Sequence, residues 1–169
     1  CKKIKYMFPK AHAAAYVMMA FRIAWYKIFY PLAYYAAYFS IRASAFSYEL
    51  MCQGQEKLLH YMDEYRKKGD ALSKKEQDSM KDMIVQEMYA RGYDFLPLDL
   101  YQADARRFKI IDGKLMPALS TIEGLGEKAA DAVMDAAKEG KFLSKDDFRD
   151  RTKVSKTVID LMEDRKSVV

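Results

Sequence analysis

The segment from Phe8 to Pro31, FPKAHAAAYVMMAFRIAWYKIFYP, constrains the fold most, because it places one imidazole and a few cations in an otherwise apolar helix. Apolar side chains recur every three to four residues from Tyr16 to Tyr30, which is the spacing of a helical stripe. Pro31 should end this helix, because proline lacks the N–H that would continue the hydrogen-bond ladder. The alanines from Ala11 to Ala15 leave the helix start nearly bare, so a backbone, a base pair or a sugar-phosphate has room to approach it closely.

The cations of the chain are concentrated at its front. The net charge is +5 over 169 residues, and residues 1 to 50 hold seven Lys or Arg against a single acid, Glu49. Clustered cations attract phosphates and release counterions on binding, so this half of the chain suggests a polyanionic partner. Composition alone favours the alternative, a solvated rim on a helical core, and a hydrophobic content of 51% is enough for such a core.

Neither apolar run in the front half fits a membrane span. Arg22 interrupts the first run, and Pro31 interrupts the second run, which follows Lys27. A span needs about 20 predominantly apolar residues, so both runs are predicted to be buried helices of a soluble protein with no membrane partner. The chain shows no cleavable signal, and the predicted location is cytoplasmic.

The chain does not have the residue pattern of a metal site or a disulfide framework. Cys1 and Cys52 belong to no CxxC pair, and His12 and His60 lie at no metal-ligand spacing from them. Both thiols are therefore predicted to be reduced, and no metal ligand is assigned.

Three further helices are predicted in the first half of the chain. Pro31 suits the first position of a helix that continues as LAYYAAYFSIRA. A second helix should run from about Glu49 to Lys68, since a glycine follows and cations fill its last turn. Ser73 and Glu76 have the spacing of a capping box, which opens a third helix that ends at Gly92.

Beyond Gly92 the pattern changes from helical to extended. Residues 93 to 100 alternate apolar with polar side chains, and Asp112-Gly113 between two short apolar runs is the strongest hairpin signal in the chain. A two-stranded ribbon is therefore predicted, and residues 101 to 117 are interpreted as a β-hairpin connector between two domains.

The last part of the chain predicts short helices joined by tight turns. The segment IEGLGEKAA, from Ile122 to Ala130, matches the hydrophobic-x-Gly-hydrophobic-Gly-x-x-x-Ala core of a helix-hairpin-helix motif. Ser144 and Ser155 mark two further helix starts. The turn between those helices, residues 152 to 155, is predicted to form a degenerate second hairpin.

The glycines of the first hairpin suggest a phosphate site. Gly124 and Gly126 allow backbone angles closed to other residues, so the N–H groups that start the next helix can face a phosphate oxygen, with Lys128 adding a cation one turn on. Such contacts hold DNA without reading its bases. Two alternatives remain, a dinucleotide-binding fingerprint, which lacks its parallel strand-helix-strand setting, and a plain glycine turn between packed helices.

Five segments of the chain resemble one family in unbroken order. They are FPKAHAAAYVMMAFRIAWYKIFYPLAYYAAYFSIRAS, EMYARGYDFLPLDL, RFKIIDGKLMPAL, IEGLGEKAADAV and SKTVIDLM. Together they are very similar to the PolC-type DNA polymerase III alpha subunit, the replicative polymerase of Gram-positive bacteria. The resemblance implies a mainly α fold: the C-terminal part of a helical fingers subdomain (1–100), the β-hairpin connector (101–117), and a (helix-hairpin-helix)2-like duplex-binding domain (118–163).

The resemblance also implies roles for particular residues. In the related polymerases the first helix packs over the nascent base pair, so Lys10 is assigned to triphosphate or template electrostatics, and His12 to a hydrogen bond at the incoming nucleotide. Tyr16 and Phe8 are assigned to shaping the nucleotide pocket. Residues assigned to duplex DNA are Gly124, Leu125, Gly126, Lys128, Lys153, Ser155 and Lys156.

By the same resemblance the chain is a fragment of an enzyme and no enzyme by itself. Phosphoryl transfer needs carboxylates that hold two metal ions, and the family's catalytic aspartates belong to a palm domain before this segment. Mg²⁺ is therefore expected in the absent palm, with no cofactor here, and the acidic pairs at 63–64 and 146–147 are interpreted as structural. The expected partners are primer-template DNA, the incoming dNTP and the remainder of the polymerase chain.

The end of the chain departs from the family. PolC-type polymerases continue past a SKTVIDLM-like segment to a short clamp-docking motif, whereas this chain ends in residues 164–169, DRKSVV. Clamp binding is therefore not predicted. These six residues are interpreted as a non-native tail, since the adapter-like DNA sequence GATCGGAAGAGCGTCGTG encodes them in order.

Two other function classes stay open. One is a noncatalytic helix-hairpin-helix module for DNA binding or repair, in which the front helices are only a scaffold. The other is an amphipathic protein that binds membrane surfaces through its basic, tyrosine-rich half.

Overall fold

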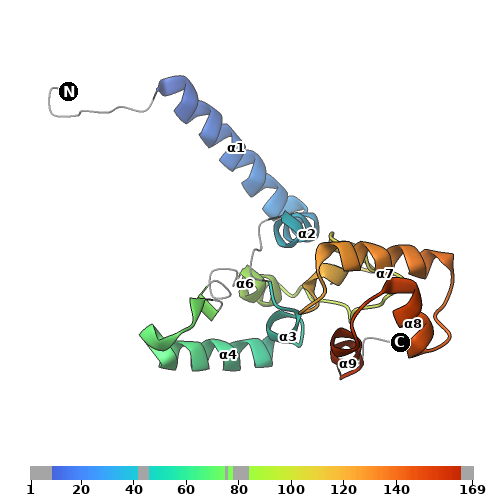
Figure 1. Cartoon of the computed structure of the whole chain (residues 1–169). Helices are drawn as coiled ribbons and strands as arrows, with labels where there is room; N and C mark the ends of the chain where they lie inside the picture. Colours follow the sequence, from blue (N-terminus) through green and yellow to red (C-terminus); the bar gives the residue numbers. More distant parts are fainter. Residues whose placement is uncertain (1–8, 42–45, 75, 78–83, 165–169) are drawn as a thin grey trace.

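The chain is mainly helical, as the sequence predicts, with one small antiparallel ribbon (Figure 1). A computed structural model describes residues 9–41, 46–74, 76–77 and 84–164. Its elements are α1 (Lys10–Phe29), α2 (Pro31–Ile41), α3 (Tyr48–Met51), α4 (Gln55–Lys68), η1 (Gly69–Ala71), α6 (Ile84–Ala90), β1 (Lys109–Ile111), β2 (Lys114–Met116), η2 (Leu119–Thr121), α7 (Glu127–Glu139), α8 (Lys145–Thr152) and α9 (Lys156–Asp164).

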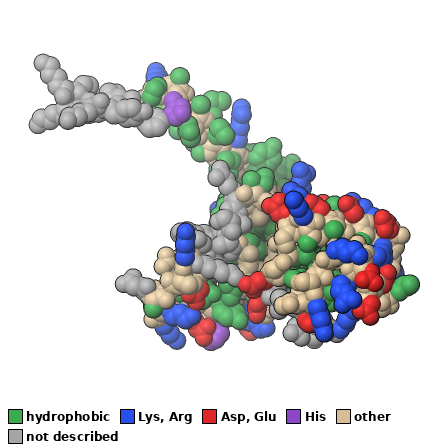
Figure 2. All heavy atoms as spheres, in the orientation of Figure 1, with side chains coloured by type: hydrophobic (Ala, Val, Ile, Leu, Met, Phe, Trp, Pro, Cys, Tyr) green, Lys and Arg blue, Asp and Glu red, His purple; other side chains and the backbone are tan. Residues whose placement is uncertain are grey.

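Helix α1 projects away from the rest of the molecule (Figure 1). It ends at Phe29, with Tyr30 as its C-cap, and α2 starts at Pro31, so the predicted elbow is confirmed. The prediction that α1 is a buried helix is wrong for this chain, because none of its residues is buried and Phe21 is 73% exposed. Hydrophobic side chains accordingly line its surface (Figure 2). An apolar stripe predicts that a surface will be covered, but the covering partner need not lie in the same segment.

The predicted single helix from Glu49 to Lys68 is wrong, since the structure contains two helices there. Helix α3 ends at Met51, and Gly54, with φ of 99°, stands before α4. A residue with positive φ cannot continue a right-handed helix, and glycine adopts that angle with little strain. The predicted stop of α4 at Gly69 is confirmed.

The capping box that follows α4 is also confirmed. The Ser73 N–H donates to Glu76 Oε2 at 2.8 Å, and the Glu76 N–H donates to Ser73 Oγ at 3.3 Å. Part of the helix predicted to follow it lies outside the described residues, and its end is seen as α6, which stops before Gly92.

The ribbon forms where Asp112-Gly113 predicts it. Strands β1 and β2 pair antiparallel, with Lys109 opposite Met116. Both turn residues have positive φ, 49° at Asp112 and 74° at Gly113, as a two-residue hairpin turn requires. Leu115 is buried with the α2, α4 and α6 side chains, whereas Met116 is buried with those of α7 to α9. The ribbon therefore contributes to both hydrophobic clusters, and the predicted division into domains stays a prediction.

Helices α7, α8 and α9 form the C-terminal part of the molecule. Ser144 caps α8, since its side chain accepts a hydrogen bond from the Asp147 N–H. The largest side chains of this cluster are completely or almost completely buried, among them Phe148 and Met162. Tyr48 and Leu98 reach the same cluster from earlier in the chain, so the front half and the C-terminal helices share a core. Across the described residues, we find no helix that combines the length and the apolar character needed to cross a membrane.

Candidate nucleic-acid interface

The first hairpin is a tight turn between η2 and α7. The Leu125 N–H donates to the Ile122 carbonyl at 3.1 Å, and the Ala130 N–H donates to the Gly126 carbonyl at 2.9 Å. Gly126 is the N-cap residue of α7 and provides no side chain to cap the helix. The first N–H groups of an α-helix have no partner within the helix, so this end of α7 can present donors to an anion.

The two glycines of this turn serve different purposes. Gly124 has φ of +83°, and a Cβ there would lie 3.2 Å from Val158 Cγ2 on α9. Gly126 has φ of −67° and ψ of 161°, which any residue adopts, and a Cβ there would meet no atom within 4 Å. The prediction that both glycines need unusual angles is therefore wrong for Gly126. Its missing side chain leaves open space beside the α7 N-terminus.

The predicted second hairpin is the turn between α8 and α9. Lys153 is the C-cap of α8 and has left-handed angles, φ 58° and ψ 22°, while its N–H donates to the Arg149 carbonyl at 2.8 Å. A non-glycine residue in this region costs about 1–2 kcal/mol. The neighbouring Val154 is buried and fixes the turn against the core.

The structure brings the two hairpins together. Because a Cβ on Gly124 would lie 3.2 Å from Val158 Cγ2, the glycine turn of the first hairpin lies beside the N-terminal turn of α9. Six of the residues assigned to DNA are exposed: Gly124, Gly126, Lys128, Lys153, Ser155 and Lys156. The side chain of Leu125 is only 4% exposed, so this residue can offer a ligand its backbone alone.

Arg106 is a cation at this site that the sequence reasoning missed. Its guanidinium lies 3.1 Å from Glu127 Oε2 and also pairs with Asp131, both on the first two turns of α7. Its backbone N–H donates to Asp104 Oδ1 at 2.9 Å. Burial raises the pKa of Asp104, but the backbone hydrogen bonds from Arg106 and Arg107 act in the opposite direction, and the net effect is a lowered pKa. In the sequence, the two adjacent arginines of the run DARRF, just before the ribbon, are the feature that could have indicated a cation here. A cavity of about 500 Å³ lies beside Arg106 and Gly126.

The residues assigned to the nucleotide lie at the far end of α1. Lys10, His12 and Tyr16 are exposed, and the His12 and Tyr16 rings are 4.5 Å apart between centroids, so the predicted shared face is confirmed. Phe8 lies outside the described residues. The α1 N-cap is Pro9, which makes no side-chain capping bond. This group lies at the end of α1 remote from the rest of the molecule (Figure 1).

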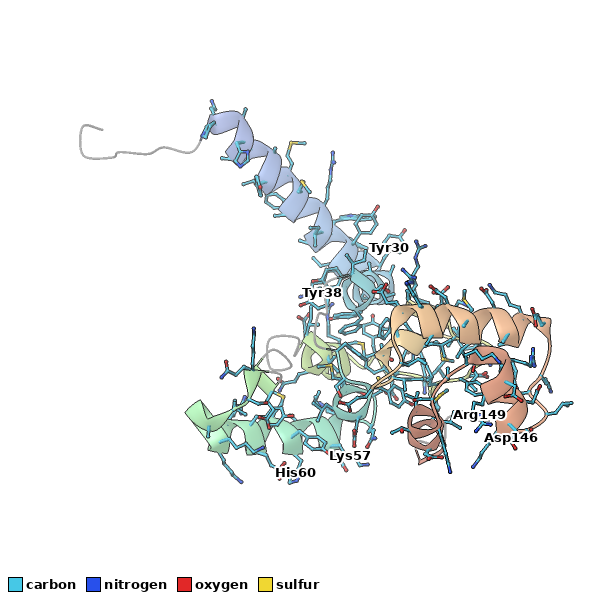
Figure 3. The ribbon with its side chains drawn as sticks, in the orientation of Figure 1. Tyr30, Tyr38, Lys57, His60, Asp146 and Arg149 are labelled. Carbon is cyan, nitrogen blue, oxygen red and sulfur yellow. The ribbon has the colours of Figure 1, made fainter. Side chains whose placement is uncertain are left out.

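The acidic pairs are engaged in structural contacts. Asp63 lies 3.7 Å from Arg66 on α4, and Asp146 lies 4.0 Å from Arg149 on the exposed face of α8 (Figure 3). Asp147 Oδ2 accepts a hydrogen bond from the Leu143 N–H at 3.0 Å. Within the described residues, no three His, Cys, Asp or Glu side chains are grouped to hold a metal ion. The carboxylates of these residues hold arginines and a helix end and are not arranged as a two-metal site.

Known proteins resemble this chain in sequence along almost its whole length. A family profile described as a helix-hairpin-helix motif matches residues 92–164. The PolC-type DNA polymerase III of Clostridium perfringens is 47% identical over 164 residues, which is 96% of this chain and 11% of the relative. The chain matches PolC-type DNA polymerase III along almost its whole length. The resemblance found in the sequence is thereby confirmed.

Other PolC-type polymerases match to the same extent. That of Listeria monocytogenes is 48% identical over 167 residues, 98% of this chain and 12% of the relative, and that of Bacillus subtilis is 46% identical over 164 residues, 96% of this chain and 11% of the relative. The chain thus spans about a ninth of the length of these relatives. The dinucleotide-binding alternative finds no support, because the strands before Gly124 form an antiparallel ribbon.

Proposed function

We propose that this chain is part of a PolC-type replicative DNA polymerase and contacts both the incoming nucleotide and the finished duplex. The observation that carries the proposal is the match to PolC-type polymerases at 44–48% identity, which runs through the α1 segment and the hairpins alike. The partners are primer-template DNA, a dNTP and the remainder of the polymerase chain, and the setting is the cytoplasm.

Duplex binding is assigned to the paired hairpins. The open space at Gly126 lets a phosphate oxygen approach the first N–H groups of α7, where the helix dipole favours an anion. Lys128, Lys153 and Lys156 are exposed, and their positive charge would attract DNA of any sequence. Because no base edge is read, binding should be independent of sequence and should weaken steeply as salt rises.

The strain at Lys153 supports this assignment. A lysine occupies a left-handed position that glycine would adopt with less strain, and such strain gathers at functional positions. The ammonium group of Lys153 on the exposed turn is a contact that glycine could not make.

Nucleotide binding is assigned to the start of α1. Lys10 neutralises triphosphate or template charge, and His12 donates or accepts a hydrogen bond at the incoming nucleotide. Tyr16, in ring contact with His12, shapes the pocket together with Phe8. The alanines between them leave room for a base pair to lie against the helix.

Chemistry is assigned to other parts of the polymerase. The acidic pairs of this chain hold arginines and a helix cap. By the resemblance to PolC-type polymerases, Mg²⁺ is expected on the aspartates of the palm domain of the polymerase. The isolated chain is therefore expected not to incorporate nucleotides.

The nucleotide assignment is tested by His12→Ala in the full-length polymerase. Loss of a hydrogen bond at the nucleotide should raise the KM for dNTP by about twofold to tenfold, since one such bond contributes about 0.5–1.5 kcal/mol. The affinity for primer-template DNA should not change. Steady-state incorporation on a primed template measures KM, and an unchanged KM would remove His12 from the site.

The rival function, a noncatalytic helix-hairpin-helix module, is tested by duplex binding of a shortened chain. If the chain is such a module, its duplex binding should survive the removal of residues 1 to 92, because the front helices would then be only a scaffold. The match of the α1 segment to polymerases favours the polymerase reading.

A further inference from the structure

Helix α1 is attached to the molecule at one end only. Every residue from Lys10 to Phe29 is exposed except Lys27, which is partly buried. Tyr30 and Tyr38 lie near the point where α1 meets α2 (Figure 3), and the opposite end of α1 extends away from the body (Figure 1). The contacts around Lys27, together with the packing of α1 on α2 at the elbow, therefore hold the direction of the whole helix.

Four polar side chains meet at that point, from α1, from α2, from α6 and from the residue just after α6. Lys27 Nζ lies 2.7 Å from Glu87 Oε2 on α6, and the Tyr35 hydroxyl on α2 donates to Glu87 Oε1 at 3.0 Å. Arg91 Nη1 donates to the Lys27 main-chain carbonyl at 3.0 Å and to the Tyr35 hydroxyl at 3.3 Å. We call Lys27, Tyr35, Glu87 and Arg91 the α1 anchor network.

The network fixes α1 by its main chain as well as by a side chain. The Lys27 carbonyl lies in the last turn of α1, where helix carbonyls have no partner within the helix, and Arg91 satisfies it. The Lys27 hydrogen bond lowers the pKa of Glu87, and the same bond raises the pKa of Lys27, so both groups are charged across the neutral range.

On the α6 side, the α1 anchor network is fixed to the hydrophobic core. Val85, Met88 and Tyr89 of α6 are buried, and the Tyr89 hydroxyl donates to the Met51 carbonyl at 2.7 Å. Through Glu87, the ion pair of Lys27 links α1 to a part of the chain 60 positions further along the sequence.

A small tilt of α1 at Lys27 produces a large displacement of His12. His12 precedes Lys27 by fifteen residues, which is about 22 Å along an α-helix. A tilt of about 5° at Lys27 then moves His12 by about 2 Å. A misplacement of about 1 Å at a reacting centre costs up to about 100-fold in rate.

We infer that Glu87 and Arg91 are positioning residues, which aim α1 from α6 and so place Lys10 and His12 at the incoming nucleotide. This inference rests on the proposed function of the α1 start. Neither residue touches the nucleotide, because both lie on or next to α6, at the end of α1 remote from His12.

The test compares Glu87→Gln with a matched control in the full-length polymerase. Glu87→Gln keeps the shape of the side chain and removes the charge that holds Lys27. We expect KM for dNTP to rise about tenfold, with the affinity for primer-template DNA and the melting temperature unchanged. Glu64→Gln, on the exposed face of α4, removes a glutamate outside the network and should leave KM unchanged.

Two variants of Lys27 show whether the contact itself matters. Lys27→Arg keeps a cation that can reach Glu87 and should retain a KM close to that of the wild type. Lys27→Met should raise KM as Glu87→Gln does, and the double variant should be no worse than either single one, because both changes break the same bond. Should Glu87→Gln fail to fold, Tyr35→Phe carries the test, with an expected rise in KM of about threefold.

The outcomes separate this inference from the proposed function. If His12→Ala raises KM and Glu87→Gln does not, the positioning role is wrong and the nucleotide site stands. If His12→Ala has no effect, the proposed nucleotide site is wrong. If Glu87→Gln lowers the melting temperature, kcat and DNA affinity together, Glu87 is a general structural residue and the inference is overturned.

Discussion

At the scale of single residues, Gly126 and Gly124 show that one motif can contain glycines for two different reasons. Gly124 is required by its φ of +83° and by the closeness of Val158. Gly126 has no such structural reason, since its angles are ordinary and the space beside it is open. A glycine that the fold does not need points to a ligand that approaches the backbone closely.

This difference predicts opposite effects of substitution. Gly126→Ser should leave the stability unchanged or raise it by up to about 0.5 kcal/mol, because serine is a favourable N-cap residue. It should nevertheless weaken duplex binding by about tenfold, since the hydroxymethyl group occupies the phosphate path and its oxygen caps the donors. Thermal melting and fluorescence anisotropy with a labelled duplex measure the two effects.

Gly124→Ala provides the matched comparison. It should destabilise the fold by about 1–2 kcal/mol, because alanine is strained at positive φ and its Cβ would contact Val158 at 3.2 Å. If Gly126→Ser melts at a lower temperature than the wild type and still binds duplex normally, Gly126 is only a turn residue.

At the scale of elements, the start of the helix at Ser73 depends on an ionised carboxylate. Hydrogen bonds from Lys68 and from Ser73 lower the pKa of Glu76 from 4.5 to about 2. A carboxyl group whose pKa is lower in the folded state stabilises the fold above its unfolded pKa, and this contribution is lost as pH falls through the folded value. The stabilisation by Glu76 should therefore be complete above about pH 5 and disappear towards about pH 2.

The measurement is the melting temperature of wild type and Glu76→Gln as a function of pH. The variant should melt at a lower temperature at pH 6, and the difference should shrink between about pH 4.5 and about pH 2. A difference that stays constant over this range would show that Glu76 contributes through its shape and not through its charge.

Local signals in the sequence predicted many elements, because their causes are local. The proline after Tyr30, the Ser73 capping box, the Asp112-Gly113 turn and the Ser144 cap each depend on neighbouring residues, and each is found. The break before α4 was missed, since Gly54 lies inside a run that reads as one helix until its φ of 99° is known.

Only part of the candidate site could be predicted from the sequence, because only part of it depends on residues that are neighbours in the chain. The hairpin glycines form a local motif, so their turn could be read directly, although the ordinary angles of Gly126 could not. Arg106 and Glu87 were missed because each depends on a partner distant in sequence, at Asp131 and at Lys27. No periodicity or spacing indicates such pairs.

At the scale of the whole molecule, the two candidate sites lie at opposite ends. The α1 start extends from one side, and the paired hairpins belong to the C-terminal helices (Figure 1). The long exposed apolar surface of α1 was predicted to be buried, and the chain corresponds to about a ninth of its relatives. The surface that covers α1 is therefore to be sought in the remainder of a polymerase.

The most direct test of the account is photocrosslinking by the full-length polymerase on primed DNA with a bound dNTP. A photoreactive phenylalanine at Tyr16 should crosslink to the nucleotide or the nascent base pair, and the same group at Lys128 should crosslink to the duplex several base pairs behind the primer end. The account is contradicted if the group at Lys128 crosslinks to protein alone while the group at Tyr16 never reaches the nucleotide.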